Sequence, residues 1–129
     1  MNPRAHPTRH LLVVDDDFAN RLLPGLFMRE RGWRVSECAS ADEAWPVLAG
    51  GGITDLLMDI SLPRTSGLEF CRQLRASPDA GSLNIYAYTA HAIQSERKTF
   101  LKVGFNGILI KPIRQSDLIG LLEGEAGPV

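Results

Sequence analysis

Short apolar runs that end on polar residues recur along this chain of 129 residues. Leu11 to Val14 is continuous and stops at Asp15, and the run from Asp55 to Ile60 carries Asp59 near its end. Runs this short and this apolar are typical of strands buried on both faces, as in a parallel sheet. Together with three similar segments, they predict strands at 11–14, 33–37, 55–60, 84–89 and 107–110.

Between these runs, apolar residues recur at helical spacing. They predict helices over 18–31, after Ser40, around 68–74, over 94–103 and over 115–122. Ser40 and Ser66 each stand three residues before a glutamate, which is the spacing of a capping box. Pro24 is expected to kink the first helix, and Pro46 to leave the second short or irregular.

Five strands that alternate with helices predict an α/β fold, with a parallel sheet, right-handed crossovers and helices on both faces. The length fits one domain, which we expect to span residues 9–123. Residues 1–8, which contain two prolines, are expected to form a flexible N-terminal segment, and residues 124–129 a flexible tail.

Composition and charge exclude some broad functions. A net charge of −1 and a pI near 6.3 give no general attraction to nucleic acid or to anionic membranes. No apolar stretch approaches the roughly 20 residues of a membrane span. Cys38 and Cys71 lack the spacing of a metal or redox pair and are interpreted as structural thiols of a reducing compartment. We therefore expect a cytoplasmic protein, either a monomer or a weak dimer.

Chemistry is expected at the carboxyl ends of the strands, where open α/β sheets place their sites. Asp15, Asp16 and Asp59 would converge there, together with Thr89 and Lys111. Carboxylates so close repel one another, and Mg²⁺ removes that repulsion while leaving room for a phosphate oxygen. Shielded by the metal, Asp59 could then act as a nucleophile towards a phosphoryl group. The lysine ammonium and the threonine hydroxyl suit the oxygens of that group.

With these residues the chain resembles the response-regulator receiver family of two-component signalling. The resemblance covers about residues 9–123 and rests on four motifs. These are Val13-Val14-Asp15-Asp16, Leu57-Met58-Asp59-Ile60 with Leu62-Pro63 and Gly67, Tyr88-Thr89-Ala90, and Lys111-Pro112.

The resemblance implies the flavodoxin-like strand order 2-1-3-4-5. It also implies that Asp59 is phosphorylated by a histidine kinase or a histidine phosphotransfer protein, and that the phosphorylated domain controls protein contacts. By the same resemblance Mg²⁺ is held by Asp16, Asp59 and the main-chain carbonyl of Ser61, with help from Asp15. The Lys111-Pro112 bond is expected to be cis. The chain would act without an output domain, as a diffusible regulator or a relay intermediate, and not as an enzyme on an external substrate.

Three positions depart from the common pattern of the family. Ile108 stands three places before the lysine, where Tyr or Phe is usual, so the signal is expected to pass mainly through the loop after Thr89 and the helix over 94–103. Thr65-Ser66-Gly67 replaces the usual end of the acceptor loop. Tyr88 occupies a usually aliphatic place, and the sequence does not indicate its effect.

Other interpretations stay open at this point. Asp15-Asp16-Asp17 contains the Asp-x-Asp spacing of haloacid-dehalogenase phosphatases. That family needs a further acidic pair after its lysine, whereas this chain offers Asp117, Glu123 and Glu125 only on or after the last helix. A receiver-like module that is never phosphorylated, or a piece of a hybrid kinase, would share the same motifs. Asp17 is interpreted as a local backbone acceptor, and His91 as a surface residue at the border of the site.

Overall fold

The computed structural model describes residues 9–62, 65–80, 82–90 and 96–124. Its strands are β1 (His10–Val14), β2 (Arg34–Cys38), β3 (Asp55–Asp59), β4 (Asn84–Thr89) and β5 (Gly107–Ile110). Its helices are α1 (Phe18–Glu30), α2 (Ala41–Ala49), α3 (Gly67–Ala76), α4 (Arg97–Val103) and α5 (Gln115–Glu123), with a short 3-10 turn, η1 (Pro78–Ala80), after α3. The predictions about residues 1–8, 125–129 and His91 lie outside the described residues, as does the predicted start of the fourth helix.

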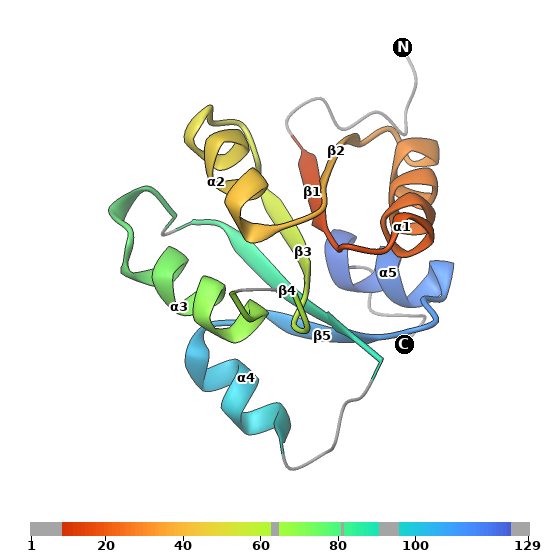
Figure 1. The fold of residues 1–129 in the computed structure, drawn as a ribbon. Coiled ribbons are helices and arrows are strands. Elements are labelled where there is room, and N and C mark those ends of the chain that lie inside the picture. The colour runs from red at the N-terminus through yellow and green to blue at the C-terminus, as the bar shows by residue number, and fades with distance from the viewer. Residues whose placement is uncertain (1–8, 63–64, 81, 91–95, 125–129) are drawn as a thin grey trace.

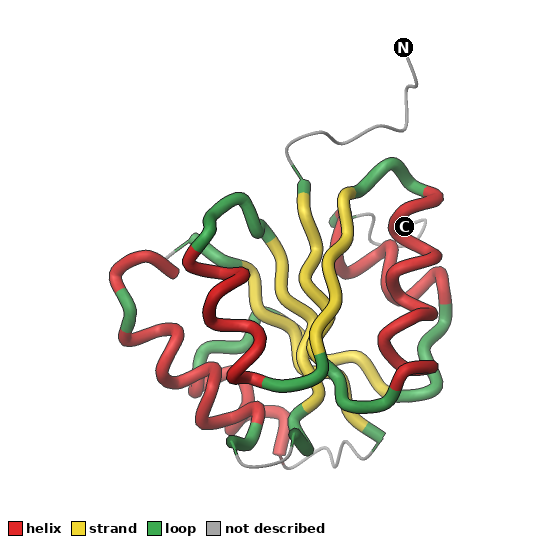
Figure 2. The backbone as a smooth tube through the Cα atoms, turned by 45° about the horizontal axis from the view of Figure 1, so that its top comes forward, coloured by secondary structure: helices red, strands yellow, loops and turns green. Residues whose placement is uncertain are grey.

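The five strands form one parallel sheet in the order β2-β1-β3-β4-β5. Figure 1 shows α1 and α5 on one face of the sheet and α2, α3 and α4 on the other, and Figure 2 shows the strands as the central layer. The predicted α/β class, strand order and two-sided cover are confirmed. This order makes β1 and β3 neighbours, although a helix, a strand and a second helix separate them in the chain.

Alternation along each strand divides the apolar residues between two cores. Leu12, Val14 and Met58 join the core under α2, α3 and α4, which includes Phe70 and Phe100. The core under α1 and α5 contains the strand residues that alternate with these, which are Leu11, Val13, Leu57, Tyr86, Tyr88 and Leu109, and also Met28, Trp33, Ile113, Leu118 and Leu122. Burial on both faces explains why the strands have nearly continuous apolar sequences.

Side chains begin three of the helices. Ser40 and Ser66 accept hydrogen bonds of 3.2 Å from the amides of Glu43 and Glu69, as the spacing predicts. Glu43 also accepts a bond of 3.3 Å from the amide of Ala39. The carboxylate of Glu69 instead pairs with Arg72 within the same helix, so only half of the second capping box forms. Asp17 caps α1 through the amide of Asn20, in agreement with its interpretation as a local acceptor.

Neither proline ends its helix. α1 continues through Pro24, which is buried, and α2 through the exposed Pro46. A proline removes one backbone hydrogen bond, and packing of the helix on the sheet can offset that loss. α2 is short, with nine residues, as expected. The kink at Pro24 stays a prediction.

A polar network fixes the amino ends of the strands, opposite the predicted site. Asp55 is fully buried and accepts hydrogen bonds from Thr54, Arg9, Asn84 and Tyr86. A buried carboxylate is tolerated when donors surround it in this way. These hydrogen bonds connect the starts of β1, β3 and β4, and so they stabilise the amino edge of the sheet.

Candidate functional site at the carboxyl edge of the sheet

Three carboxylates meet where β1 and β3 end. Asp59 is the last residue of β3, and Asp15 and Asp16 follow β1 directly. Because these strands are parallel neighbours, their carboxyl ends lie at the same edge. One carboxylate oxygen from each of the three residues lies within 4.8 Å of the others. Asp15 and Asp59 are buried, whereas Asp16 is exposed, so the cluster is open to solvent on one side.

Lys111, the residue after β5, places its ammonium between two of these carboxylates. Its Nζ lies 2.8 Å from Asp15 Oδ2 and 3.1 Å from Asp59 Oδ2. Burial alone lowers the pKa of Lys111, but its contacts with the two carboxylates outweigh burial and raise that pKa above its usual value. The ammonium is therefore charged at neutral pH and offsets part of the repulsion between the carboxylates. The peptide bond that follows, Lys111-Pro112, is cis as predicted.

The two oxygens of Asp15 differ in their surroundings. Oδ1 accepts a hydrogen bond of 2.9 Å from the amide of Asp17. Oδ2 lies 2.8 Å from Lys111 Nζ, but this contact does not have the geometry of a hydrogen bond. Among the buried side-chain oxygens of the described residues, Oδ2 is the one without a hydrogen bond. Burial is the main cause that raises the pKa of Asp15, while Lys111 and the Asp17 amide act against it. A buried oxygen with this unmet capacity, next to two more carboxylates, fits a hard divalent cation such as Mg²⁺.

The main chain holds Asp59 from two sides. Its Oδ1 accepts a hydrogen bond of 2.8 Å from the amide of Ser61, which fixes the carboxylate against the following loop. Gly67, the first residue of α3, donates its amide to the Ile60 carbonyl at 3.1 Å. A Cβ atom at Gly67 would lie 2.8 Å from the Asp59 carbonyl oxygen and 2.6 Å from the Ile60 Cα, so this approach requires glycine. The predicted role of the Ser61 carbonyl as a metal ligand stays a prediction.

Thr89 is on β4, the strand next to Asp59, and Ile108 is on β5, one strand further away. Thr89 ends β4 and is buried, and its carbonyl accepts a hydrogen bond of 2.8 Å from the Lys111 amide. This bond ties the end of β4 to the residue that carries the ammonium. Ile108 is paired with Ala87 on β4 and packs against the core under α3 and α4.

Two side-chain contacts of the site were not predicted from the sequence. The ring of Tyr88 lies under the ammonium, with its centroid 4.8 Å from Lys111 Nζ. Burial, followed by the charges of Asp15, Asp59 and Asp17, raises the pKa of Tyr88 to about 12. Arg21 of α1 donates a hydrogen bond of 2.8 Å to the main-chain carbonyl of Asp15. The unusual residue before Thr89 was the only sequence signal for the first feature, and α1 gave none for the second.

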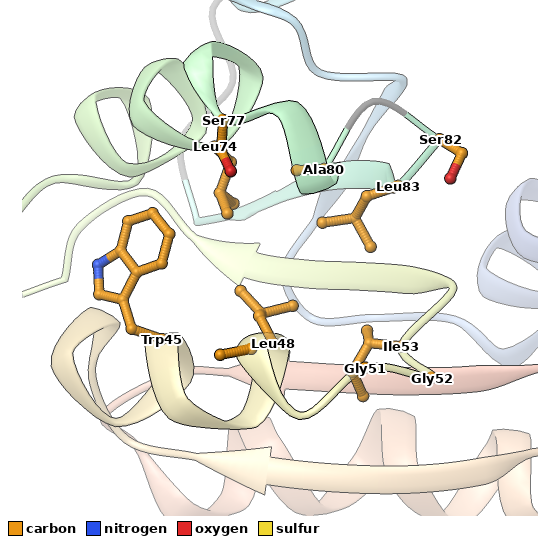
Figure 3. Close-up of a pocket in the computed structure, with 11 residues that line it drawn as sticks. Trp45, Leu48, Gly51, Gly52, Ile53, Leu74, Ser77, Ala80, Ser82 and Leu83 are labelled. Atoms are coloured by element: carbon orange, nitrogen blue, oxygen red, sulfur yellow. The ribbon is translucent and has the colours of Figure 1, made fainter.

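The hollow shown in Figure 3 is a separate feature. It has a volume of about 380 Å³ and lies between α2 and the end of α3, where Trp45 and Leu48 face Leu74 and Leu83. Of its lining residues, Leu83 directly precedes β4, and Ile53 is separated from β3 by Thr54 alone. The hollow is therefore at the amino edge of the sheet, opposite the carboxylates.

The remaining candidate residues are not part of the carboxylate cluster, although the Cys38 carbonyl accepts a hydrogen bond of 3.2 Å from the Asp15 amide. Cys38 and Cys71 are free and buried, and burial raises the pKa of each thiol to about 11. Glu123, one of the late acidic residues, pairs with Arg31 and accepts a hydrogen bond from the Trp33 indole. No helix in the described ranges is long and apolar enough to cross a membrane.

Comparison with known sequences defines the class of protein. The response regulator receiver domain family matches residues 11–123. An uncharacterized 14.6 kDa protein of Leptolyngbya boryana is 33% identical, over 88% of this chain and 86% of that protein. The response regulator MprA of Mycobacterium avium is 36% identical over 84% of this chain but 47% of its own length, and the autoinducer 2 sensor kinase/phosphatase LuxQ of Vibrio vulnificus is 31% identical over 84% and 12%.

Solved structures agree with this match. A response regulator receiver protein from Pseudomonas putida superposes with a TM-score of 0.82 at 28% identity, over 91% of this chain and 97% of that one. The receiver domain of sensor histidine kinase PA1611 from Pseudomonas aeruginosa, which holds a magnesium ion in its active site cleft, gives 0.79 at 30% identity, over 89% and 94%. The receiver domain of Ssk1 from Saccharomyces cerevisiae, solved with the phosphotransfer protein Ypd1, gives 0.77 at 27%, over 84% and 82%.

The fold, the strand order and the family match together establish that this chain belongs to the response regulator receiver family of two-component signalling. It spans nearly all of one curated relative and about half or less of the two others named above.

Proposed function

We propose that Asp59 accepts a phosphoryl group from the phosphohistidine of a histidine kinase or a histidine phosphotransfer protein. The observation that carries this proposal is the position of the Asp59 carboxylate at the open edge of the sheet, 3.1 Å from the Lys111 ammonium and within the cluster of three aspartates. Two similar structures support these donor classes: the receiver domain of sensor histidine kinase PA1611, and the receiver domain of Ssk1 in complex with the histidine phosphotransfer protein Ypd1.

In the proposed transfer an Asp59 oxygen attacks phosphorus, a new O–P bond forms, and the P–N bond to the donor imidazole breaks with its electron pair going to nitrogen. The product is an acyl phosphate on Asp59 and a neutral donor histidine once the ring nitrogen regains a proton. Lys111 pairs with an oxygen of the transferred group, where a charge-assisted contact is strongest. Thr89, the last residue of the adjacent strand β4, would donate its hydroxyl to a second oxygen.

Asp15, Asp16 and Asp59 would hold Mg²⁺, with the Ser61 carbonyl as a further ligand. Bound there, the ion would supply positive charge that lets an anionic phosphoryl donor approach a carboxylate. The chain's own share is to keep Asp15 buried beside Asp59, and to fix the Asp59 carboxylate through the Ser61 amide.

The phosphorylated domain would then act by changing its contacts with partner proteins, with residues 9–123 as the functional unit. We place it in the cytoplasm, a reducing compartment that suits two free buried thiols. The chain itself assists the gain and loss of the phosphoryl group at Asp59 and turns over no external substrate. The phosphatase alternative is disfavoured because Glu123 is engaged by Arg31 and Trp33.

A small phosphodonor tests the proposal. Incubation with acetyl phosphate and Mg²⁺ should add the mass of one phosphoryl group to the wild type and none to Asp59→Asn. Asp17→Asn is the matched control, because it removes a nearby carboxylate while asparagine still caps α1. Full phosphorylation of Asp59→Asn, or of the wild type in excess chelator, would refute the assignment.

A further inference from the structure

The ring of Tyr88 is on the same face of the sheet as the side chains of Asp59 and Lys111. Tyr88 is in register with Asp59 on β3 and with Leu109 on β5. Residues in register on neighbouring parallel strands project to the same face. Lys111 is two residues beyond Leu109, and its side chain therefore returns to this face as well. The ring is 1% exposed, so its position is set by packing under α1 and α5.

Among the described residues, three groups contact the Lys111 ammonium. Two are the Asp15 and Asp59 carboxylates, and the third is the face of the Tyr88 ring, with its centroid 4.8 Å from Nζ. An ammonium within about 6 Å of an aromatic centroid is attracted by the ring quadrupole, and the attraction grows when water is excluded. The Lys111 side chain is 14% exposed, so little water competes for it.

The three neighbours would not persist equally through phosphorylation. Both carboxylates are predicted to bind Mg²⁺, and Asp59 loses its free carboxylate when it is phosphorylated. The Tyr88 ring is uncharged and fixed in the core, so its contact with the ammonium can last through both events. A lysine needs such a support, because its four-carbon chain is flexible and its charge is not directional.

We propose that Tyr88 is a positioning residue: its buried ring holds the Lys111 ammonium above Asp59 by a cation–π contact, ready to pair with a phosphoryl oxygen. This proposal rests on the proposed function for its consequence, since the contact matters only if Asp59 is the acceptor. The contact itself can be tested without phosphorylation.

The first experiment measures the contact in the metal-free protein. The ring current of Tyr88 should shift the Lys111 Hε protons upfield in side-chain NMR spectra of the wild type. Tyr88→Phe should keep this shift, and Tyr88→Leu should lose it. Lys111 Hε protons at ordinary positions in the wild type would overturn the proposal, whatever phosphorylation shows.

The second experiment separates positioning from packing. Tyr88→Leu should slow phosphorylation by acetyl phosphate about 5- to 30-fold, the range for loss of a partly desolvated cation–π contact, and Tyr88→Phe should restore a rate near wild type. In a Lys111→Ala background, Tyr88→Leu should change the rate less than about twofold, because the group it positions is gone. If Tyr88→Leu does not fold, Tyr88→Met takes its place.

Tyr86→Leu is the matched control. Tyr86 is a buried tyrosine on the same strand and face, but its hydroxyl contacts Asp55 at the opposite edge of the sheet. An equal slowing by Tyr86→Leu, or by Tyr88→Leu with and without Lys111, would show that the ring acts only through packing and overturn the proposal. A wild type that is never phosphorylated would refute the proposed function, while the NMR result would still decide the contact.

Discussion

Lys111 and Mg²⁺ are expected to share the same two carboxylates. The ammonium lies 2.8 Å from Asp15 and 3.1 Å from Asp59, so its removal leaves both free for a cation. Lys111→Ala should therefore bind Mg²⁺ at least as tightly as wild type, whereas Asp16→Ala should bind at least about tenfold more weakly. Amide chemical shifts during a Mg²⁺ titration measure both affinities, with the exposed Lys102→Ala as control. Wild-type affinity in Asp16→Ala would show that the site is misplaced.

Asp15 gives the metal-free protein a predictable response to pH. Because burial raises the pKa of Asp15 in the folded state, the protonated carboxyl is favoured there, and its stabilising contribution is lost as pH rises through the raised pKa. Ionisation of the buried Asp15 as pH rises therefore lowers the stability of the folded protein. Asp15→Asn should therefore raise the free energy of unfolding at neutral pH in chelator, and the gain should shrink as pH falls.

Urea unfolding at several pH values measures this gain, with Asp17→Asn as the exposed control. A loss of stability in Asp15→Asn at neutral pH, similar to its change in acid, would contradict the account. Added Mg²⁺ should favour the wild type, since only the folded aspartate cluster holds the ion.

At the residue scale, sequence was sufficient where position on a strand decides the outcome. Asp15, Asp59 and Lys111 follow or end strands, and parallel pairing alone brings them to one edge. The Tyr88 contact could not be predicted, because it depends on the side-chain conformation of Lys111 and on packing under α5. The hydrogen bond from the Ser61 amide to Asp59 was not predicted either, because the pattern of hydrophobic residues does not determine the conformation of a loop.

Helix α3 begins in direct contact with the backbone of the acceptor strand. A methyl group at Gly67 would lie 2.6 Å from the Ile60 Cα, which backbone atoms cannot relieve by a side-chain rotation. Gly67→Ala should therefore lower the free energy of unfolding by about 1–3 kcal/mol, the usual range for overpacking, and slow phosphorylation of Asp59 by displacing its loop. Denaturant unfolding and intact-mass kinetics measure the two effects.

Gly50→Ala is the control for this prediction. Gly50 ends α2 in a right-handed conformation, and a Cβ there would meet its nearest neighbour at an ordinary 3.5 Å. Equal stability of Gly67→Ala and Gly50→Ala would show that α3 yields easily and does not fix the acceptor loop.

At the element scale, the strands were predicted within one residue at each end. Apolar runs buried on both faces leave little freedom in where a strand lies, whereas helix ends depend on caps and on tertiary packing. The prolines illustrate this limit: helix propensity disfavours Pro46 inside α2, yet the helix continues because its inner face packs on the sheet. Helix propensity depends on residues that are close in sequence, whereas packing on the sheet depends on residues that are far apart in sequence.

At the scale of the whole molecule, the amino edge of the sheet is held by hydrogen bonds, whereas the carboxyl edge is open to solvent. Asp55 binds four neighbours at the amino edge, while the carboxyl edge carries an exposed Asp16 and a buried oxygen without a well-directed hydrogen bond. The alternation of strands and helices predicted the layers, but the strand order came from the resemblance to the receiver family. The identity of a donor kinase or a downstream partner could not be predicted from the fold, because receivers with the same fold bind different partners.

The most direct test of the account is to identify the residue that carries the phosphoryl group. The wild-type chain is incubated with a phosphorylated histidine phosphotransfer protein and Mg²⁺, and borohydride then reduces any acyl phosphate to a stable alcohol. Peptide mass spectrometry should find that alcohol at Asp59, and should find none when Mg²⁺ is chelated. Modification at Asp15, Asp16 or another residue, or equal modification of Asp59 without Mg²⁺, would contradict the account.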